Sequence, residues 1–319
     1  MSLPDWARAH GSPLCEGKLR STPADFDVTE KLGYEFDGQG EHDYLYLEKT
    51  GTNTEWLARQ LAKFAGVAAK EVGYSGLKDR NAVTRQWFSV PRWHEPDWSA
   101  LDIDGVTALD VQRHSKKLRR GAHQSNHFRI VLRDLKKGSD LFSERLAVIR
   151  EQGVPNYFGP QRFGRDGGNI ELANAWAAGK RLPRHKRSIA ISTARSFLFN
   201  ETLHQRVVDG SWNRLLPGDI ANLDGTGSVF PVAAVDQELE RRCAEMDIHP
   251  AAELPGDGSN CRNADWQAAF DKARVKPGSR SLRLRVQALE MDQGDESITL
   301  SFTLRRGAFA TSVLREIVQ

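Results

Sequence analysis

The sequence predicts an α+β protein in which a discontinuous domain, built on a mostly antiparallel sheet, is interrupted by an inserted domain. At 319 residues the chain is too long for one ordinary small core, and its length favours about two domains. Apolar and polar residues alternate as in strands over much of residues 1–152 and again in residues 284–319. Residues 153–283 follow a different pattern of apolar and polar residues. From pattern alone, two consecutive domains, the second containing the last hairpin, are the alternative.

The first strands are expected within residues 24–50, where apolar and polar residues alternate in short runs such as DYLYLE (43–48). A helix should follow. Thr52 and Glu55 have the spacing of a capping box, and apolar residues then recur on one face. Gly66 stands where a residue with left-handed backbone would end that helix.

A short turn, GYSGLKDRNAVTRQ (73–86), holds one acidic residue, Asp79, among three basic ones. It lies between two runs, 72–77 and 86–90, that predict strands, so we expect Asp79 on an exposed connection between them. A lone aspartate in such a turn is most often a turn cap or part of a surface ion pair. The turn itself therefore leaves the role of Asp79 open.

Strict alternation over residues 126–132 predicts a half-buried strand that carries Phe128 on one face. Residues 140–152 predict a helix that Gly153 ends. A hairpin and a final helix are expected near the C-terminus, at residues 281–289, 297–304 and 309–318.

The middle of the chain opens with GVPNYFGPQRFGRDGGN (153–169), in which two prolines and five glycines break all periodicity. This segment is either a domain boundary or a functional loop. Residues 170–207 then follow a helical pattern, and residues 209–270 are expected to be irregular because they are rich in glycine, proline and acidic residues.

Composition excludes several classes of protein. With 39% hydrophobic and 27% charged residues, the chain is typical of soluble globular proteins, and it has no apolar run near the roughly 18 residues that a membrane span needs. The N-terminal residues lack the apolar core of a signal peptide, so we expect a cytoplasmic protein. Three scattered cysteines without a Cys-x-x-Cys pair argue against a disulfide framework or a structural zinc site.

The net charge is only +3, but the basic residues are concentrated in three runs. Residues 113–129 hold six Lys or Arg and no acid, and residues 180–187 hold five and no acid. Residues 274–285 add five more. One such run is usually just a solvated face, whereas three together favour contact with a polyanion.

Common cofactor motifs are missing from the sequence. No Gly-x-Gly-x-x-Gly opens a helix, and no P-loop, Gly-x-Ser-x-Gly elbow or zinc deaminase signature occurs. What remains is a set of basic runs, loop aromatics and isolated acids. We therefore expect a surface that faces RNA and a chemistry that needs no metal or nucleotide cofactor.

Four separate motifs resemble the TruD family of tRNA pseudouridine synthases and occur in family order. They are ADFDVTE (24–30) with EHDYLYLEKTGTNT (41–54), GLKDRNAVTRQ (76–86), VPNYFGPQRFG (154–164) and RRGAFATSVLREI (305–317). The resemblance implies a pseudouridine-synthase-like catalytic domain, formed by residues 1–152 and 284–319, with an inserted α/β domain at residues 153–283.

The family's chemistry is a cofactor-free isomerisation in which an aspartate attacks a uridine, the base detaches and turns, and it rejoins the ribose through carbon 5. By resemblance the nucleophile is Asp79. An attacking carboxylate must be ionised, which nearby cations favour. Lys78, Arg80 and Arg85 are candidates because they are close in sequence, and the resemblance adds Arg20. Adjacent residues on an extended chain point opposite ways, so the sequence does not select one.

By the same resemblance the residues that contact the uridine are Phe26, Asn126 and Phe309. Such an enzyme must extrude its target base and hold it by stacking and by hydrogen bonds to its edge, which phenylalanine rings and an asparagine amide can supply. Each also has an ordinary structural interpretation, as a core residue, a strand start or a helix staple. Phe128 is left undecided between the core and the wall of the site.

In the NYFGPQRFG segment, Asn156, Gln161 and Arg162 could line a cleft, or its aromatic residues could merely pin the domain junction. The basic runs 113–120 and 180–187 are expected to grip tRNA from two sides. The resemblance implies that the protein makes pseudouridine at position 13 in the D arm of tRNA without a cofactor. We also expect a monomer that binds no metal and no membrane. A non-catalytic RNA-binding module and a synthase that acts on another RNA position are the alternatives.

Overall fold

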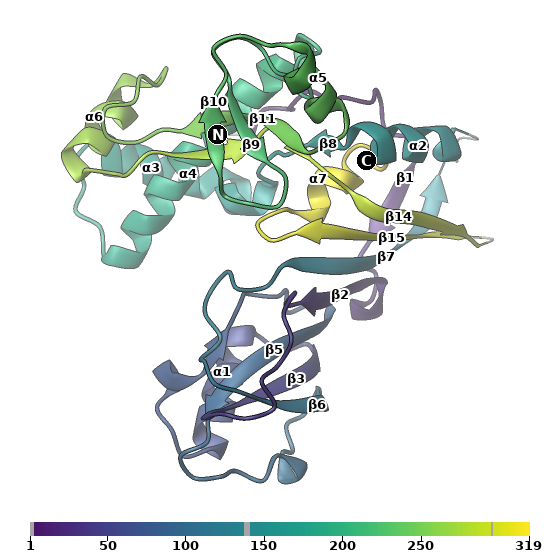
Figure 1. The fold of residues 1–319 in the computed structure, drawn as a ribbon, viewed down its shortest axis with the longest axis vertical. Coiled ribbons are helices and arrows are strands. Elements are labelled where there is room, and N and C mark those ends of the chain that lie inside the picture. The colour runs from purple at the N-terminus through teal and green to yellow at the C-terminus, as the bar shows by residue number, and fades with distance from the viewer. Residues whose placement is uncertain (1–2, 137–140, 295) are drawn as a thin grey trace. The chain divides into compact units, whose positions relative to one another are not determined.

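The computed structural model describes residues 3–136, 141–294 and 296–319 (Figure 1). Its internal contacts divide the chain into two compact units. The sheet unit comprises Cys15–Ser139 and Gln287–Gly307, and the helix unit comprises Met1–Leu14, Asp140–Val286 and Ala308–Gln319. Both chain ends thus fall with the middle of the chain. These units are not the predicted catalytic and inserted domains, whose boundaries are at 152/153 and 283/284. That division into domains stays a prediction.

The sheet unit is built on a nine-stranded sheet of described residues, with the order β14-β15-β7-β2-β5-β3-β6, β1 beside β7, and β4 beside β5 (Figure 1). Within the described sheet, only β2 and β5 run parallel. The strands are β1 (Glu16–Leu19), β2 (Phe26–Lys31), β3 (His42–Thr50), β4 (Gly73–Tyr74), β5 (Val83–Pro91), β6 (Val106–His114), β7 (Ser125–Lys136), β14 (Gln287–Gln293) and β15 (Ser297–Arg305). The expected mostly antiparallel sheet is confirmed.

One helix, α1 (Thr54–Phe64), covers part of this sheet, and its buried Leu57 and Leu61 belong to one hydrophobic cluster with strand residues such as Phe88. The helix lies where the sequence predicts it, but its N-cap is a different residue from the one predicted. Asn53, not Thr52, accepts hydrogen bonds from the backbone N–H groups of Glu55 and Trp56. The capping-box spacing pointed one residue too early. Gly66 does adopt the expected left-handed backbone, with φ of +68°.

The helix unit combines helices with two small sheets, ordered β10-β9-β11-β12 and β13-β8 (Figure 1). Its helices are α2 (Phe142–Gln152), α3 (Gly168–Ala177), α4 (Arg184–Val208), α5 (Gln237–Ala244), α6 (Ala264–Ala273) and α7 (Ala310–Leu314). Its strands are β8 (Val154–Pro155), β9 (Ile220–Leu223), β10 (Val229–Pro231), β11 (Ile248–Leu254), β12 (Gly278–Ser281) and β13 (Arg283–Leu284). No helix in the described part of the chain is long and apolar enough to cross a membrane.

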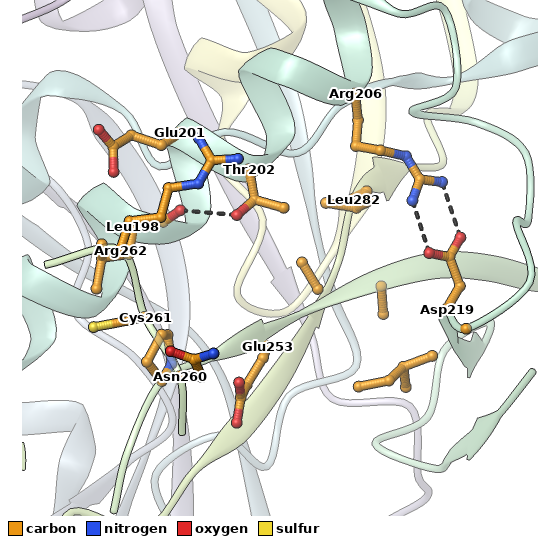
Figure 2. A pocket seen from close by; sticks show the side chains of 15 residues that line it. Leu198, Glu201, Thr202, Arg206, Asp219, Glu253, Asn260, Cys261, Arg262 and Leu282 are labelled. Atoms are coloured by element: carbon orange, nitrogen blue, oxygen red, sulfur yellow. Dashed lines mark hydrogen bonds and ion pairs between the residues drawn. The ribbon is translucent and has the colours of Figure 1, made fainter. Parts of the chain in front are cut away.

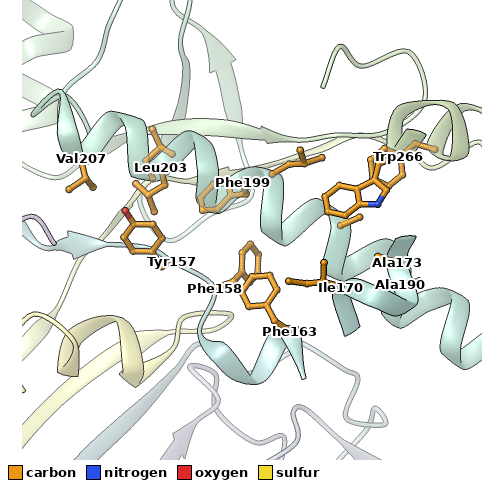
Figure 3. Close-up of a cluster of buried hydrophobic side chains, with 14 of the residues drawn as sticks. Tyr157, Phe158, Phe163, Ile170, Ala173, Ala190, Phe199, Leu203, Val207 and Trp266 are labelled. Carbon is orange, nitrogen blue, oxygen red and sulfur yellow. The ribbon is translucent and has the colours of Figure 1, made fainter. Parts of the chain in front are cut away.

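An aromatic-rich cluster forms the core of the helix unit (Figure 3). Tyr157, Phe158 and Phe163, from the segment that breaks the sequence periodicity, are all buried in it. They meet α4 residues such as Phe199, whose ring lies edge-on to that of Phe158 with the centroids 5.6 Å apart. The segment without sequence periodicity is therefore held in place because its aromatic side chains are buried in the core of the helix unit.

Two predictions for this part of the chain were wrong. Residues 209–270 are not irregular, because they form three strands and two short helices, α5 and α6, capped by Asp236 and Asn263. These elements are too short for periodicity to reveal. The expected strand 281–289 is also divided: its first residues pair with β11 and β8, and only Gln287 onward pairs with β15.

Candidate active site

The connection that carries Asp79 joins β4 to β5 in the sheet unit, as the sequence predicted. Polar side chains hold it at several points. The backbone N–H of Lys78 donates to the Thr54 hydroxyl oxygen at 3.0 Å, and that hydroxyl donates to the Gln86 side chain. The Gln86 amide in turn donates to the Gly76 carbonyl at 3.2 Å. Asp79 is therefore presented by a loop anchored to both α1 and β5.

The cation that faces the Asp79 carboxylate is Arg20, whose Nη2 lies 2.7 Å from Asp79 Oδ2. Arg20 follows β1 and has a left-handed φ of +59°. Its guanidinium also lies over the Phe26 ring, 4.1 Å from the ring centroid. The Asp79 side chain is 41% exposed, so it is held in place and still accessible from solvent.

The other candidate cations have different partners. Lys78 Nζ lies 2.6 Å from Glu30 Oε2, and both side chains are buried. Arg80 donates to the Gly51 carbonyl, and Arg85 pairs with Asp27 and Glu48. Among the cations that the sequence left open, the structure thus assigns Arg20 to the carboxylate.

A buried lysine, Lys49, supports the same loop from beneath. Its Nζ donates to the backbone carbonyls of Thr52 and Asp79, at 2.7 and 3.1 Å. Burial lowers the Lys49 pKa to about 8, and the charge of Asp79 opposes that shift. Lys49 fixes the main chain of Asp79, whereas Arg20 contacts its side chain.

Asn126, at the start of β7, is joined to the Asp79 connection through His123 and Ser75. His123 Nε2 lies 3.3 Å from Asn126 Nδ2, and His123 Nδ1 lies 2.6 Å from the Ser75 hydroxyl. Burial, followed by the charges of Lys78 and Arg306, lowers the His123 pKa to about 4. Asn126 Oδ1 is buried without a hydrogen-bond partner among the described residues, which leaves a free acceptor there.

Phe26 and Phe128 lie on neighbouring strands, with ring centroids 6.2 Å apart, and both are buried. Phe128 also stacks on Phe302 at 5.4 Å. Phe128 is therefore a core residue that packs against Phe26 and Phe302. Since the Arg20 guanidinium lies over the Phe26 ring, a base could stack there only after Arg20 moves.

Phe309 belongs to the helix unit, at the residue before α7. It is half-buried, and its ring centroid lies 6.1 Å from that of Phe158. Arg280 lies 5.8 Å from the centre of the Phe309 ring. Phe309 is thus part of a cluster of aromatic and cationic side chains in its own unit.

Sequence reasoning missed Glu30, Lys49, Thr54, Gln86 and His123 as neighbours of the site. A signal was present for three of them. Glu30, Lys49 and Gln86 occupy positions in alternating strands where their apolar neighbours face inward, and all three are buried. A polar residue in the buried phase of a strand marks a place where a specific partner is required.

A pocket of about 360 Å³ lies within the helix unit (Figure 2). Its wall includes the ion pair between Arg206 and Asp219, with nitrogen-to-oxygen distances of 2.7 and 2.9 Å. Thr202, also in the wall, bonds to the Leu198 carbonyl of its own helix. None of the predicted catalytic or uridine-contacting residues line this pocket. No group of three described His, Cys, Asp or Glu side chains is placed to hold a metal ion.

Comparison with known proteins agrees with this fold. The family model for tRNA pseudouridine synthase D (TruD) matches residues 7–173, 169–269 and 264–317. A tRNA pseudouridine synthase D of Methylococcus capsulatus (strain Bath) is 43% identical over 99% of this chain and 94% of its own. One of Pseudomonas fluorescens is 42% identical over 98% of this chain and 94% of its own.

Among solved structures, a protein from Methanosarcina mazei, named as a tRNA pseudouridine synthase D (TruD), superposes with a TM-score of 0.73. It covers 97% of this chain and 95% of its own, and its 20% identity supports the fold alone. Together these matches define the class: the protein is an isomerase, a pseudouridine synthase. The chain belongs to the TruD family of tRNA pseudouridine synthases.

Proposed function

We propose that the protein converts uridine 13 in the D arm of tRNA to pseudouridine, with Asp79 as the nucleophile and without a cofactor. The bond between the ribose and N1 of uracil breaks, and a bond between the ribose and carbon 5 forms. N1 gains a proton and carbon 5 loses one, so the reaction consumes no other reactant. The observation that carries the proposal is the anchored, accessible Asp79 carboxylate, paired with Arg20 at 2.7 Å.

The arrangement around Asp79 suits such a reaction. The loop is fixed by Thr54 and Lys49, so the carboxylate needs little further ordering when it attacks. Arg20 contacts the same carboxylate with a side chain that is 30% exposed, and we expect this side chain to move when the nucleotide enters. We assign Arg20 and Lys78 supporting roles: Arg20 orients the carboxylate, and Lys78 holds the loop through Glu30.

Recognition of the base is assigned to Asn126, Phe26 and Phe309. Asn126 Oδ1 has no protein partner among the described residues, and N3–H of uracil is a donor that it can accept. Cytosine has no hydrogen at N3, so this contact would favour uracil. Phe26 and Phe309 provide apolar surface for the base or its ribose.

The basic runs 113–120 and 180–187 provide surface for the rest of the tRNA. The Lys and Arg residues of 180–187 are exposed, and several of them lie in the first turn of α4. Cations at a helix N-terminus oppose the helix dipole, so their concentration there is a local cost that binding of a polyanion would offset. We further propose a cytoplasmic monomer, with a catalytic domain of residues 1–152 and 284–319 and an inserted domain of residues 153–283.

The proposal is tested with an unmodified tRNA that carries tritium at carbon 5 of its uridines. Wild-type protein is expected to release tritium without any added cofactor, and mapping should place the new pseudouridine at position 13. Asp79→Asn is expected to release none while it still binds the tRNA. Equal release by both proteins would remove Asp79 as the nucleophile, and no release from any RNA would favour an RNA-binding module.

A further inference from the structure

Two arginines of the helix unit pack against one aromatic ring. Arg280, on β12, has its guanidinium carbon 4.1 Å from the centroid of the Phe158 ring, and Arg162 has its own at 5.4 Å. Phe158 is held in the hydrophobic cluster of this unit and cannot readily turn away (Figure 3). The ring therefore gathers two cationic side chains from separate segments of the chain.

Arg280 is held in a fixed orientation. Its Nη2 donates to Asn156 Oδ1 at 2.5 Å, and its Nε donates to the Asn156 carbonyl at 3.3 Å. The amide nitrogen of Asn156 donates to the Ser281 carbonyl, which keeps Oδ1 turned toward Arg280. This contact also explains a residue of the NYFGPQRFG segment: Asn156 positions an arginine.

Arg162 is less completely bound. Its Nη1 makes a long contact of 3.4 Å to the Ser192 hydroxyl, and its Nε is buried without a hydrogen-bond partner among the described residues. Burial lowers the Arg162 pKa, and burial followed by the charge of Arg162 lowers the Arg280 pKa to about 9. A guanidinium that burial partly removes from water, and that keeps an N–H group without an acceptor, is costly unless an acceptor such as an anion joins it, and this describes Arg162.

Arg283, a nearby arginine of purely structural character, shows the difference. It is buried, and its guanidinium donates to His249 Nδ1 and to the carbonyls of Asn213, Cys243 and Ile248. All of its nitrogens are thus used within the fold. Arg162 is half-buried and keeps one N–H group without an acceptor among the described residues, so the fold does not use all of its hydrogen-bonding capacity.

Phe309 lies beside this pair of arginines, 5.8 Å from Arg280 and 6.1 Å from Phe158. We infer that Arg162 and Arg280 bind a backbone phosphate of the tRNA, next to the nucleotide that contacts Phe309. A planar guanidinium presents paired N–H groups that match phosphate oxygens, and the contact with the aromatic ring helps to hold it in place. This site rests on the proposed function, since it takes the substrate of that reaction as its ligand.

The experiment replaces one phosphate of an unmodified tRNA at a time with an uncharged methylphosphonate, at linkages around the target uridine. Binding to wild type is compared with binding to Arg162→Gln and to Arg165→Gln. Arg165 is a matched control, because it is three residues away, its side chain is 97% exposed, and its loss removes the same charge. Arg162→Lys tests whether a charge without the guanidinium plane suffices.

For wild type and Arg165→Gln, we expect one linkage whose neutralisation weakens binding about tenfold, beyond the loss at its neighbours. Arg162→Gln should bind all the tRNAs more weakly and show no extra loss at that linkage, and Arg162→Lys should fall between. The slope of log affinity against log salt should also be lower by about 1 for Arg162→Gln. Equal sensitivity at every linkage in wild type would overturn the inference, even if the variants failed to fold.

An extra loss that persists in Arg162→Gln would overturn it as well. All of these are measurements of binding, so they do not depend on turnover. Tritium release by wild type on the same tRNA tests the proposed function separately, and its absence would leave a phosphate site in an RNA-binding protein.

Discussion

Cations are packed into both units of this protein, but their charges are satisfied in different ways. In the sheet unit, Lys78 meets Glu30 at 2.6 Å and Lys49 meets two backbone carbonyls. In the helix unit, Arg162 faces an aromatic ring and retains a buried N–H group without a partner among the described residues. The cations of the sheet unit fix a loop. Arg162 of the helix unit keeps an N–H group that can bind a ligand from outside the protein.

The difference separates residues that stabilise from residues that bind. A buried cation with a carboxylate partner makes the folded state depend on both members, because the loss of either one leaves an uncompensated charge. A buried cation that keeps an N–H group without any acceptor costs stability, and that cost is tolerated where a ligand offsets it. Substitutions in the two regions should therefore affect stability and binding in opposite proportions.

The largest effect on stability is expected for Glu30→Gln. It leaves the Lys78 ammonium buried without a carboxylate, which should lower the free energy of unfolding by about 3 to 5 kcal/mol. Urea denaturation measures the change. The double variant Glu30→Gln with Lys78→Met removes both charges and should recover most of the loss. A loss below about 1 kcal/mol in the single variant would contradict a stabilising pair.

The next effect appears on acidification. The unfolded chain binds a proton at His123 near pH 6.5, while the folded protein keeps the ring neutral because burial lowers its pKa to about 4. Stability should therefore fall as the pH drops from 6.5 to 4, by about 3 kcal/mol for this group. Denaturation of wild type and His123→Gln across this range isolates the effect. Parallel curves for the two proteins would rule it out.

A smaller effect is expected at Thr54, whose hydroxyl binds both Lys78 N–H and Gln86. Thr54→Val should lower the free energy of unfolding by about 1 to 3 kcal/mol and slow the reaction, since the Asp79 loop loses an anchor. Thr202→Val is a matched control in the helix unit, where the hydroxyl bonds only within its own helix (Figure 2). That change should cost less than about 0.5 kcal/mol. Equal costs would show that the Thr54 contacts are not special.

The smallest effect on stability is expected for Arg162→Gln. Removal of a cation that burial has desolvated should leave the free energy of unfolding within about 1 kcal/mol of wild type, or raise it slightly. Thermal unfolding in the absence of RNA measures it. A loss comparable with that of Glu30→Gln would mean that Arg162 stabilises the fold as Lys78 does.

Much of the sheet unit could be predicted because its strands alternate clearly, as β7 does with Phe128, Ile130 and Leu132 all buried. The turn that carries Asp79 was also predictable, since two strand-like runs flank it. The helix unit was harder, because its strands and α5 are short and irregular. Local patterns also could not show that the alternating residues from Ser281 onward pair with three different strands.

At the site, the sequence named Asp79, Arg20 and Lys78 but could not pair them. The partners come from distant segments: Arg20 lies 59 positions from Asp79, and Glu30 lies 48 from Lys78. Such pairings depend on the sheet order, which alternation within one strand does not reveal. The arginine pair at Phe158 was missed for the same reason, because Arg162 and Arg280 meet only through the tertiary fold.

We expect Arg20 to act on the reacting carboxylate and Arg162 to act on the bound RNA. Single-turnover tritium release and tRNA affinity, measured together for Arg20→Gln and Arg162→Gln, test this most directly. Arg20→Gln should lower the rate constant at saturating tRNA by about 10- to 100-fold, while its dissociation constant changes less than about threefold. Arg162→Gln should raise the dissociation constant about tenfold, more than it changes the rate constant. If the two variants showed the same ratio of change in rate constant to change in dissociation constant, the distinction between the two regions would be contradicted.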